Sequence, residues 1–265
     1  MPWPHRHPPP ISFGLVLAAP LDATQIRAIL LDIEGTTTPV EFVYEVLFPY
    51  ARQHVEEFLA QNYSNEEVRP DMEKLLEEHL ASTQQDLEPP PWRDETINSQ
   101  VESAAAYVRW LMDRDRKSTA LKSLQGKIWE LGYREGALHA QVYSDVRTAF
   151  ARWSRQKRLI CIFSSGSILA QKLLFAHTHA GDLTPFLHAY FDTTTGAKTQ
   201  PESYERIASA LDLAPSSIAF FSDVVAELDA AQMAGMQTVL CVRPGRPEPP
   251  AGLHLVIRSF EEVFP

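Results

Sequence analysis

The sequence is poor in cysteine. Its 265 residues include only two, Cys161 and Cys241, and each lies within an apolar run, LICIF and TVLCV. So few cysteines in so long a chain argue against a disulfide-stabilised fold. We therefore expect both thiols to be buried, in a protein of a reducing compartment.

Long apolar runs and an excess of positive charge are also absent. No stretch approaches the ~20 apolar residues that a membrane-spanning helix needs. The 24 Lys and Arg residues are outnumbered by 34 Asp and Glu residues, which gives a formal net charge of -10. We therefore expect neither nucleic acid nor a membrane as a partner, although a local basic pocket for a small anion remains compatible with this charge.

The first 24 residues differ in composition from the rest of the chain. They begin MPWPHRHPPP, and Arg6 and its neighbouring histidines precede a short apolar segment that ends in small residues. This order imitates a signal peptide, but the apolar segment is at the short end for one. We interpret residues 1–24 as a proline-broken N-terminal extension ahead of the first strand.

Four short apolar runs predict the buried strands of a parallel sheet: residues 28–31, 159–163, 218–221 and 238–242. The last three runs alternate with helical patterns that begin near Ser167, Pro201 and Val224. Because 45% of the chain is hydrophobic, it can bury a large core. This alternation predicts a doubly wound α/β fold.

Residues 40–140, between the first and second runs, have little strand character. Hydrophobic residues recur at helical spacing over four stretches, 44–58, 68–76, 101–112 and 121–131, and a loop with three consecutive prolines at 89–91 divides them. This pattern predicts an all-helical cap inserted into an α/β catalytic core of residues 25–39 and 141–265. We expect the cap to act as a lid that excludes water from the site.

Polar residues follow three of the predicted strands. The first run is followed by Asp32 and Glu34, the second by Ser164 and Ser165, and the third by Asp223. Ligands of an open parallel sheet gather at the carboxyl ends of its strands. We therefore expect these three segments to converge on one edge.

The two acids after the first strand suit phosphoryl transfer. Asp32 would be a carboxylate nucleophile that attacks phosphorus and forms an aspartyl-phosphate. Glu34, two residues further on, would protonate the leaving oxygen and then activate water.

The other segments supply binding groups. Ser164 or Ser165 and the following amides, at a helix N-terminus, would hold phosphate oxygens. Asp223 would hold Mg²⁺, which prefers oxygen ligands. Lys198, on the segment before residue 201, would supply a fixed cation. Composition and spacing therefore predict a Mg²⁺-dependent phosphoryl-transfer enzyme.

Taken together, these motifs resemble a known family. The stretch DIEGTT from Asp32, the turn SSGS from Ser164, Lys198 and Asp223 match the four-motif order of the haloacid dehalogenase-like hydrolases. Longer stretches, DIEGTTTPVEFVYEVLFPY, DRKSTALKSLQGKIW, FSSGSILAQKLLF, GAKTQPESYERIA and FSDVVAELDAA, resemble the enolase-phosphatases of methionine salvage, also called acireductone synthases. Glutamate at position 34, where phosphatases of the superfamily usually carry aspartate, is shared by that subgroup.

The resemblance implies a bifunctional enzyme. Such an enzyme enolises 2,3-diketo-5-methylthiopentyl-1-phosphate and then removes the phosphate, giving the acireductone 1,2-dihydroxy-3-keto-5-methylthiopentene in the salvage of L-methionine from methylthioadenosine. It would be a monomer with one Mg²⁺ per subunit, in the cytoplasm and also in the nucleus.

The resemblance also implies roles for individual residues. Asp32, Glu34 and Asp223 would hold the metal, Ser164, Ser165 and Lys198 would bind substrate, and Asp32, Glu34 and Lys198 would be catalytic. In the wider superfamily the residue at position 34 offers its backbone carbonyl to the metal, which leaves the Glu34 side chain free for proton transfer.

Several alternatives remain open. A monofunctional phosphomonoesterase would release phosphate and form no enol. A dehalogenase needs neither a metal nor an acid at position 34. A receiver-type signalling module uses similar residues but needs no cap of a hundred residues, and a scaffold protein without activity would not need every catalytic position filled.

Individual side chains also have two interpretations. Arg116, Lys117 and Lys122 lie either on a solvated helix face or against substrate or core. Glu227 is either a partner near the metal or an ordinary first-turn helix acid. Residues 36–38, three threonines, either contact substrate or organise the turn. His177 and His179 are interpreted as loop histidines, because no third metal ligand lies nearby in the sequence.

Overall fold

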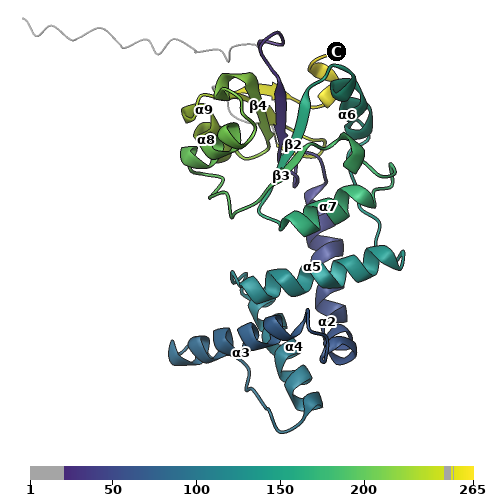
Figure 1. The fold of residues 1–265 in the computed structure, drawn as a ribbon, viewed down its shortest axis with the longest axis vertical. Coiled ribbons are helices and arrows are strands. Elements are labelled where there is room, and N and C mark those ends of the chain that lie inside the picture. The colour runs from purple at the N-terminus through teal and green to yellow at the C-terminus, as the bar shows by residue number, and fades with distance from the viewer. Residues whose placement is uncertain (1–20, 248–251, 253) are drawn as a thin grey trace, which may run out of the picture.

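The protein, seen in a computed structural model that describes residues 21–247, 252 and 254–265, is built on one parallel sheet (Figure 1). Residues 1–20 of the expected extension lie outside this range. The strands are β1 (Ala28–Leu31), β2 (Leu159–Phe163), β3 (Ala189–Phe191), β4 (Ile218–Ser222), β5 (Gln237–Cys241) and β6 (Leu255–Ile257). Their order is β3-β2-β1-β4-β5-β6, and every neighbouring pair is parallel. The four predicted strands are confirmed, and β1 lies between β2 and β4.

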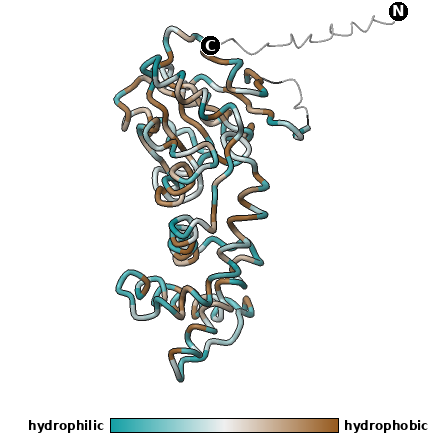
Figure 2. The backbone as a smooth tube through the Cα atoms, turned by 90° about the vertical axis from the view of Figure 1, so that its right-hand side faces the viewer, coloured by the Kyte–Doolittle hydropathy of each residue, from teal (hydrophilic) through white to brown (hydrophobic). Residues whose placement is uncertain are grey.

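Helices cover both faces of this sheet. α6 (Val146–Arg155) and α7 (Ile168–Ala176) pack against one face, whereas α8 (Pro201–Ala210) and α9 (Val225–Met233) pack against the other. Alternate residues of β1 enter opposite clusters, since Ile29 and Leu31 lie in the first and Ala28 and Leu30 in the second. The doubly wound α/β fold is therefore confirmed. In Figure 2, hydrophobic stretches run through the α/β part and also recur along the helices of the insertion.

The elements between β1 and α6 are all helical, as the sequence predicted. They are α1 (Val40–Phe42), the π-helical turn η1 (Val43–Leu47), α2 (Phe48–Asn62), α3 (Arg69–Gln84), α4 (Ile97–Asp113) and α5 (Thr119–Arg134). In Figure 1 they extend away from the sheet as a separate layer of crossing helices. Division of the chain at residues 39 and 141 stays a prediction.

Local capping explains where two of these helices begin. The Thr96 hydroxyl accepts a hydrogen bond from Ser99 N at 3.1 Å before α4, and the Ser118 hydroxyl accepts one from Leu121 N at 2.9 Å before α5. Their buried faces match the hydrophobic spacing of the sequence: α4 buries Val101, Ala104, Ala105, Val108 and Leu111, and α5 buries Leu121, Leu124 and Ile128. The cap therefore has an apolar core built from its own helices.

One helix of the insertion contacts the α/β part directly. α5 packs against α7, and a Cβ placed on Gly126 would lie 3.6 Å from the Leu169 side chain. Lys122 Nζ donates to Thr193 Oγ1, which lies in the loop after β3, at 3.4 Å. Lys122 thus contacts the core, one of the two interpretations that the sequence left open.

Both cysteines are buried free thiols, as expected. Burial raises the pKa of Cys161 to about 12, so this thiol is unreactive at neutral pH.

His177 Nδ1 lies 3.0 Å from the Leu173 carbonyl oxygen, and its ring stacks on Tyr133. Among the described residues, no helix is long and apolar enough to cross a membrane.

Candidate active site

The turn after β1 carries the first part of the site. The Ile33 carbonyl oxygen accepts hydrogen bonds from the backbone N–H groups of Thr36, Thr37 and Thr38, at 3.2, 2.9 and 2.9 Å. All three threonine side chains are fully buried. The threonines therefore organise the turn, which is one of the two interpretations of this run.

Gly35 brings this turn against the end of β4. Its φ of 74° is in the left-handed region, and a Cβ at this position would lie 2.0 Å from Asp223 Oδ2. Glycine is therefore required, because any side chain would push Asp223 away. The Asp223 carboxylate thus lies directly against the turn that carries Asp32 and Glu34.

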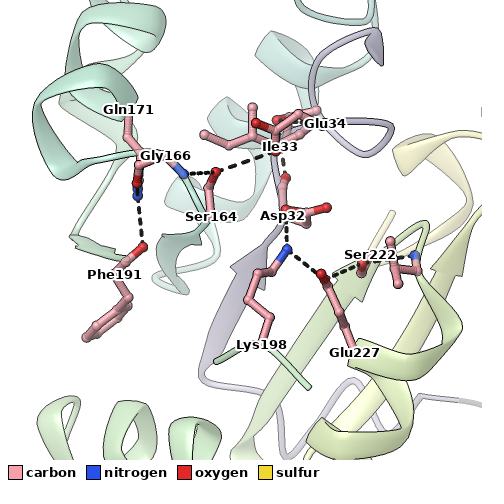
Figure 3. A network of polar contacts seen from close by, with 12 residues as sticks. Asp32, Ile33, Glu34, Ser164, Gly166, Gln171, Phe191, Lys198, Ser222 and Glu227 are labelled. Atoms are coloured by element: carbon pink, nitrogen blue, oxygen red, sulfur yellow. Dashed lines mark hydrogen bonds and ion pairs between the residues drawn. The ribbon is translucent and has the colours of Figure 1, made fainter. Parts of the chain in front are cut away.

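Asp32, Lys198 and Glu227 form a buried chain of ion pairs (Figure 3). Lys198 Nζ lies 2.5 Å from Asp32 Oδ1 and 2.6 Å from Glu227 Oε2, and the three side chains are only 10%, 4% and 12% exposed respectively. Ser222 Oγ donates to Glu227 Oε2 at 2.9 Å. Glu227 is therefore a partner within the site, which is one of the two interpretations that the sequence analysis left open.

Ser164 lies on the other side of Asp32. Its hydroxyl is buried, donates to Glu34 Oε2 at 3.4 Å, and accepts from Gly166 N at 3.1 Å. Ser165 is exposed in the same turn. Ser167 accepts from Ala170 N at 3.3 Å and caps α7, as its position in the sequence predicted. The N-terminus of α7 is therefore available to an anion beside Glu34.

Burial and mutual repulsion raise the pKa values of Glu34 and Asp223 in this site. Burial, with the charge of Asp32, raises the pKa of Glu34 to about 7. The same two causes, with the charge of Glu227, raise the pKa of Asp223 to about 6. Burial would lower the pKa of Lys198, but the attraction of Asp32 and Glu227 outweighs it and raises this pKa to about 12. The site therefore holds its lysine charged and has an excess of acids.

The donor set fits a hard divalent cation that completes its coordination with other oxygens. Within the described part of the chain, no three His, Cys, Asp or Glu side chains are arranged to hold a metal ion by themselves. The carboxylates of Asp32 and Asp223 nevertheless flank the same turn, and no described donor hydrogen-bonds to the Glu34 carbonyl oxygen. Two carboxylates, a carbonyl, substrate oxygens and water are a typical Mg²⁺ environment.

The raised pKa values predict how the stability of the metal-free protein depends on pH. The pKa of Glu34 in the folded protein, about 7, exceeds its ordinary 4.5, and that of Asp223, about 6, exceeds 3.8. The folded state therefore binds these protons more tightly than the unfolded state. Their stabilising contribution is complete below the ordinary values and is lost as the pH rises through the folded ones.

Urea unfolding in the presence of a chelator should therefore give a free energy of unfolding that falls between about pH 5 and about pH 8. Added Mg²⁺ should restore most of the loss at the higher pH, because it replaces the protons between the acids. A metal-free stability that rises over this interval would contradict the assigned crowding of acids.

Comparison with known proteins places this site in a family. The model of the haloacid dehalogenase-like hydrolases matches residues 26–235. The Enolase-phosphatase E1 of Synechococcus elongatus is 49% identical over 238 residues, which are 90% of this chain and 98% of that protein. The Enolase-phosphatase E1 of Sorangium cellulosum is 44% identical over 243 residues, which are 92% of this chain and 99% of that protein.

Solved structures agree with these sequence relatives. The crystal structure of the UTR4 protein (Unknown transcript 4 protein) from Saccharomyces cerevisiae is 32% identical, with a TM-score of 0.73 over 90% of this chain and 100% of that one. A dehalogenase structure, 17% identical with a TM-score of 0.51, shares the fold alone. The resemblance noted in the sequence is confirmed: the chain belongs to the Enolase-phosphatase E1 family of haloacid dehalogenase-like hydrolases.

Proposed function

We propose that this protein is a bifunctional Mg²⁺-dependent enolase-phosphatase, an acireductone synthase. It converts 2,3-diketo-5-methylthiopentyl-1-phosphate to 1,2-dihydroxy-3-keto-5-methylthiopentene and phosphate in the salvage of L-methionine from methylthioadenosine. The observation that carries this proposal is the pairing of Asp32, fixed by Lys198 at 2.5 Å, with Glu34, whose pKa of about 7 is suited to moving protons.

In the phosphatase step, Asp32 is the nucleophile. Its backbone N–H is held by the Phe221 carbonyl at 3.0 Å, so its carboxylate projects from a fixed strand end. Lys198 offsets the negative charge that builds up as the carboxylate approaches the phosphoryl group. Ser164, Ser165 and the amides at the start of α7 bind the phosphate oxygens.

Glu34 supplies the proton transfers. A group with a pKa of about 7 is present in both protonation states at neutral pH. Protonated Glu34 gives its proton to the leaving alkoxide, and ionised Glu34 then takes one from the water that hydrolyses the aspartyl-phosphate. In the preceding enolisation, ionised Glu34 takes a proton from the carbon next to a dione carbonyl; the C–H electron pair forms the C=C bond, the carbonyl π pair moves to oxygen, and that oxygen is then protonated to give the enol.

The metal belongs between the acids of the two neighbouring strand ends. Phosphatases of this family generally use a divalent ion, and Mg²⁺ suits the oxygen donors of Asp32, Asp223 and the Glu34 carbonyl. When bound, it supplies Lewis-acid polarisation of carbonyl and phosphoryl oxygens.

The helical insertion of residues 40–140 acts as the lid that excludes water during enolisation, and the α5 contact with α7 supports this role. The enzyme acts as a monomer with one Mg²⁺ per subunit, on a small phosphorylated molecule and on neither nucleic acid nor a membrane. It acts in the cytoplasm and also in the nucleus.

The proposal is tested by following enol absorbance and phosphate release together. The purified protein is mixed anaerobically with the dione phosphate and Mg²⁺, beside a panel of simple phosphate esters. Enol formation followed by phosphate release is the expected result, and both steps should slow in Glu34→Gln. Phosphate release from the panel with no enol from the dione would leave a monofunctional phosphomonoesterase and reject the salvage reaction.

A further inference from the structure

Arg243 is a buried cation beside the active site that the proposed mechanism does not use. It follows β5, and its side chain is only 3% exposed. Its Nη1 lies 2.6 Å from Asp145 Oδ2, and its guanidinium carbon lies 4.4 Å from the centre of the Tyr143 ring and 4.2 Å from that of Phe260. A charge buried this deeply requires either a structural or a functional explanation.

The second contact of Arg243 points to function. Its Nε donates to the Thr36 carbonyl oxygen at 2.8 Å, in the turn whose N–H groups converge on Ile33. Thr36 is two residues from Glu34 and adjoins Gly35, which is packed on Asp223. The guanidinium of Arg243 thus holds the turn that carries Asp32 and Glu34 through its hydrogen bond to the Thr36 carbonyl oxygen.

The geometry of the ion pair supports the same conclusion. Arginine–carboxylate pairs frequently form two parallel hydrogen bonds. Here Nε is directed to Thr36, and Arg243 Nη2 and Asp145 Oδ1 are buried without a hydrogen-bond partner among the described residues. The pair therefore lacks the second parallel hydrogen bond, because Arg243 Nε binds the turn instead of Asp145.

Asp145 anchors this cation to the chain that returns from the insertion. Its Oδ2 also accepts from Ser259 Oγ at 3.1 Å and from Phe260 N at 2.6 Å. Nearby, Tyr143 N donates to the Thr37 carbonyl at 3.0 Å. The segment that leaves β1 and the segment that returns from the insertion are therefore hydrogen-bonded to each other, and Arg243 contacts both of them.

We propose that Arg243 is a positioning residue for the turn of residues 32–38, and that it acts on catalysis by holding Glu34 in place. Asp32 depends less on this contact, because the sheet hydrogen bond to Phe221 and the ion pair with Lys198 hold it independently. The inference rests on the proposed role of Glu34 in phosphate release.

A double-mutant cycle separates positioning from general stability. Arg243→Lys keeps a cation beside Asp145, but a single ammonium group cannot reproduce the planar fork that contacts Asp145 through Nη1 and the Thr36 carbonyl oxygen through Nε. With the dione phosphate as substrate and phosphate release as the readout, we expect kcat to fall by ~100-fold with little change in KM, since a displacement of about 1 Å at a catalytic group has effects of this size. In a Glu34→Gln background the same change should cost less than ~3-fold, because Glu34 is no longer there to be positioned.

Ser259→Ala is the matched control. It removes one hydrogen bond to Asp145 and leaves the contact with Thr36, so it should lower the melting temperature and leave kcat at the wild-type value. If Arg243→Lys does not fold, Arg243→Gln, whose amide can donate to one acceptor, replaces it in the cycle.

Equal losses of kcat in both backgrounds, or an unchanged kcat in folded Arg243→Lys, would overturn the inference. Failure of both Arg243 variants to fold would also overturn it, because the residue would then serve stability. A wild type that released no phosphate would overturn the proposed function as well, so the two failures are distinguishable.

Discussion

Asp32→Asn should abolish phosphate release while leaving the protein folded. An amide of nearly the same shape cannot attack phosphorus, so kcat should fall by about 10⁴-fold or more, the size of loss seen when a nucleophile is removed. Lys198 keeps its contact with Glu227 at 2.6 Å, so the buried lysine remains paired. Initial rates of phosphate release and a thermal melt of the same preparation measure both effects.

The same variant should also change the neighbouring acids. The charge of Asp32 contributes to the raised pKa of Glu34, Asp223 and Glu227, so each pKa should fall when that charge is removed. NMR titration of the carboxyl carbons would detect this. Asp71→Asn, which breaks a comparable pair with Lys127 at 2.5 Å within the insertion, is the control and should retain activity. Substantial phosphate release by Asp32→Asn would reject Asp32 as the nucleophile.

Lys198→Met should damage both catalysis and stability. It leaves Asp32 and Glu227 buried without their cation, and breaking a buried pair in this way typically costs about 3 kcal/mol. The loss of free energy of unfolding should be larger at about pH 8 than at about pH 5.5, because burial and the charge of Asp32 already raise the pKa of Glu227, which can take up a proton more readily at the lower pH. Urea unfolding at the two pH values measures it.

The catalytic effect of Lys198→Met should be at least about 100-fold in kcat, the usual cost of removing a fixed group that stabilises charge in the transition state. Lys127→Met provides the control, because Lys127 is also paired at 2.5 Å with a carboxylate of low exposure but lies in the insertion. Lys127→Met should lower the free energy of unfolding and leave kcat at the wild-type value. Equal kcat losses in the two variants would mean that Lys198 acts only through folding.

The sequence predicted the central strands because they are apolar on both faces. β1, β2, β4 and β5 are buried almost throughout, so each stands out as a continuous hydrophobic run. β3 and β6 have three residues each and are only partly buried at the edges of the sheet. Short edge strands leave little hydrophobic signal, which explains why neither was predicted.

The candidate site was predictable to the extent that its residues follow strands. Asp32, Ser164 and Asp223 lie at strand ends, and the parallel topology alone brings strand ends together. For Glu227 the sequence left two interpretations open, a partner near the metal or an ordinary helix acid, and Arg243 was not predicted as part of the site or its support. Their contacts with Lys198 and Thr36 join residues far apart in the chain, and no local spacing indicates such contacts.

The most direct test of the central claim is to identify the carboxylate that carries the phosphoryl group. The enzyme is quenched during turnover of the dione phosphate and reduced with borohydride, which converts an aspartyl-phosphate to homoserine, and its peptides are then analysed by mass spectrometry. We expect reduction at Asp32, and none there in Asp32→Asn. Reduction at Asp223, Glu34 or Glu227 in place of Asp32 would contradict the assignment of the nucleophile and of the site built around it.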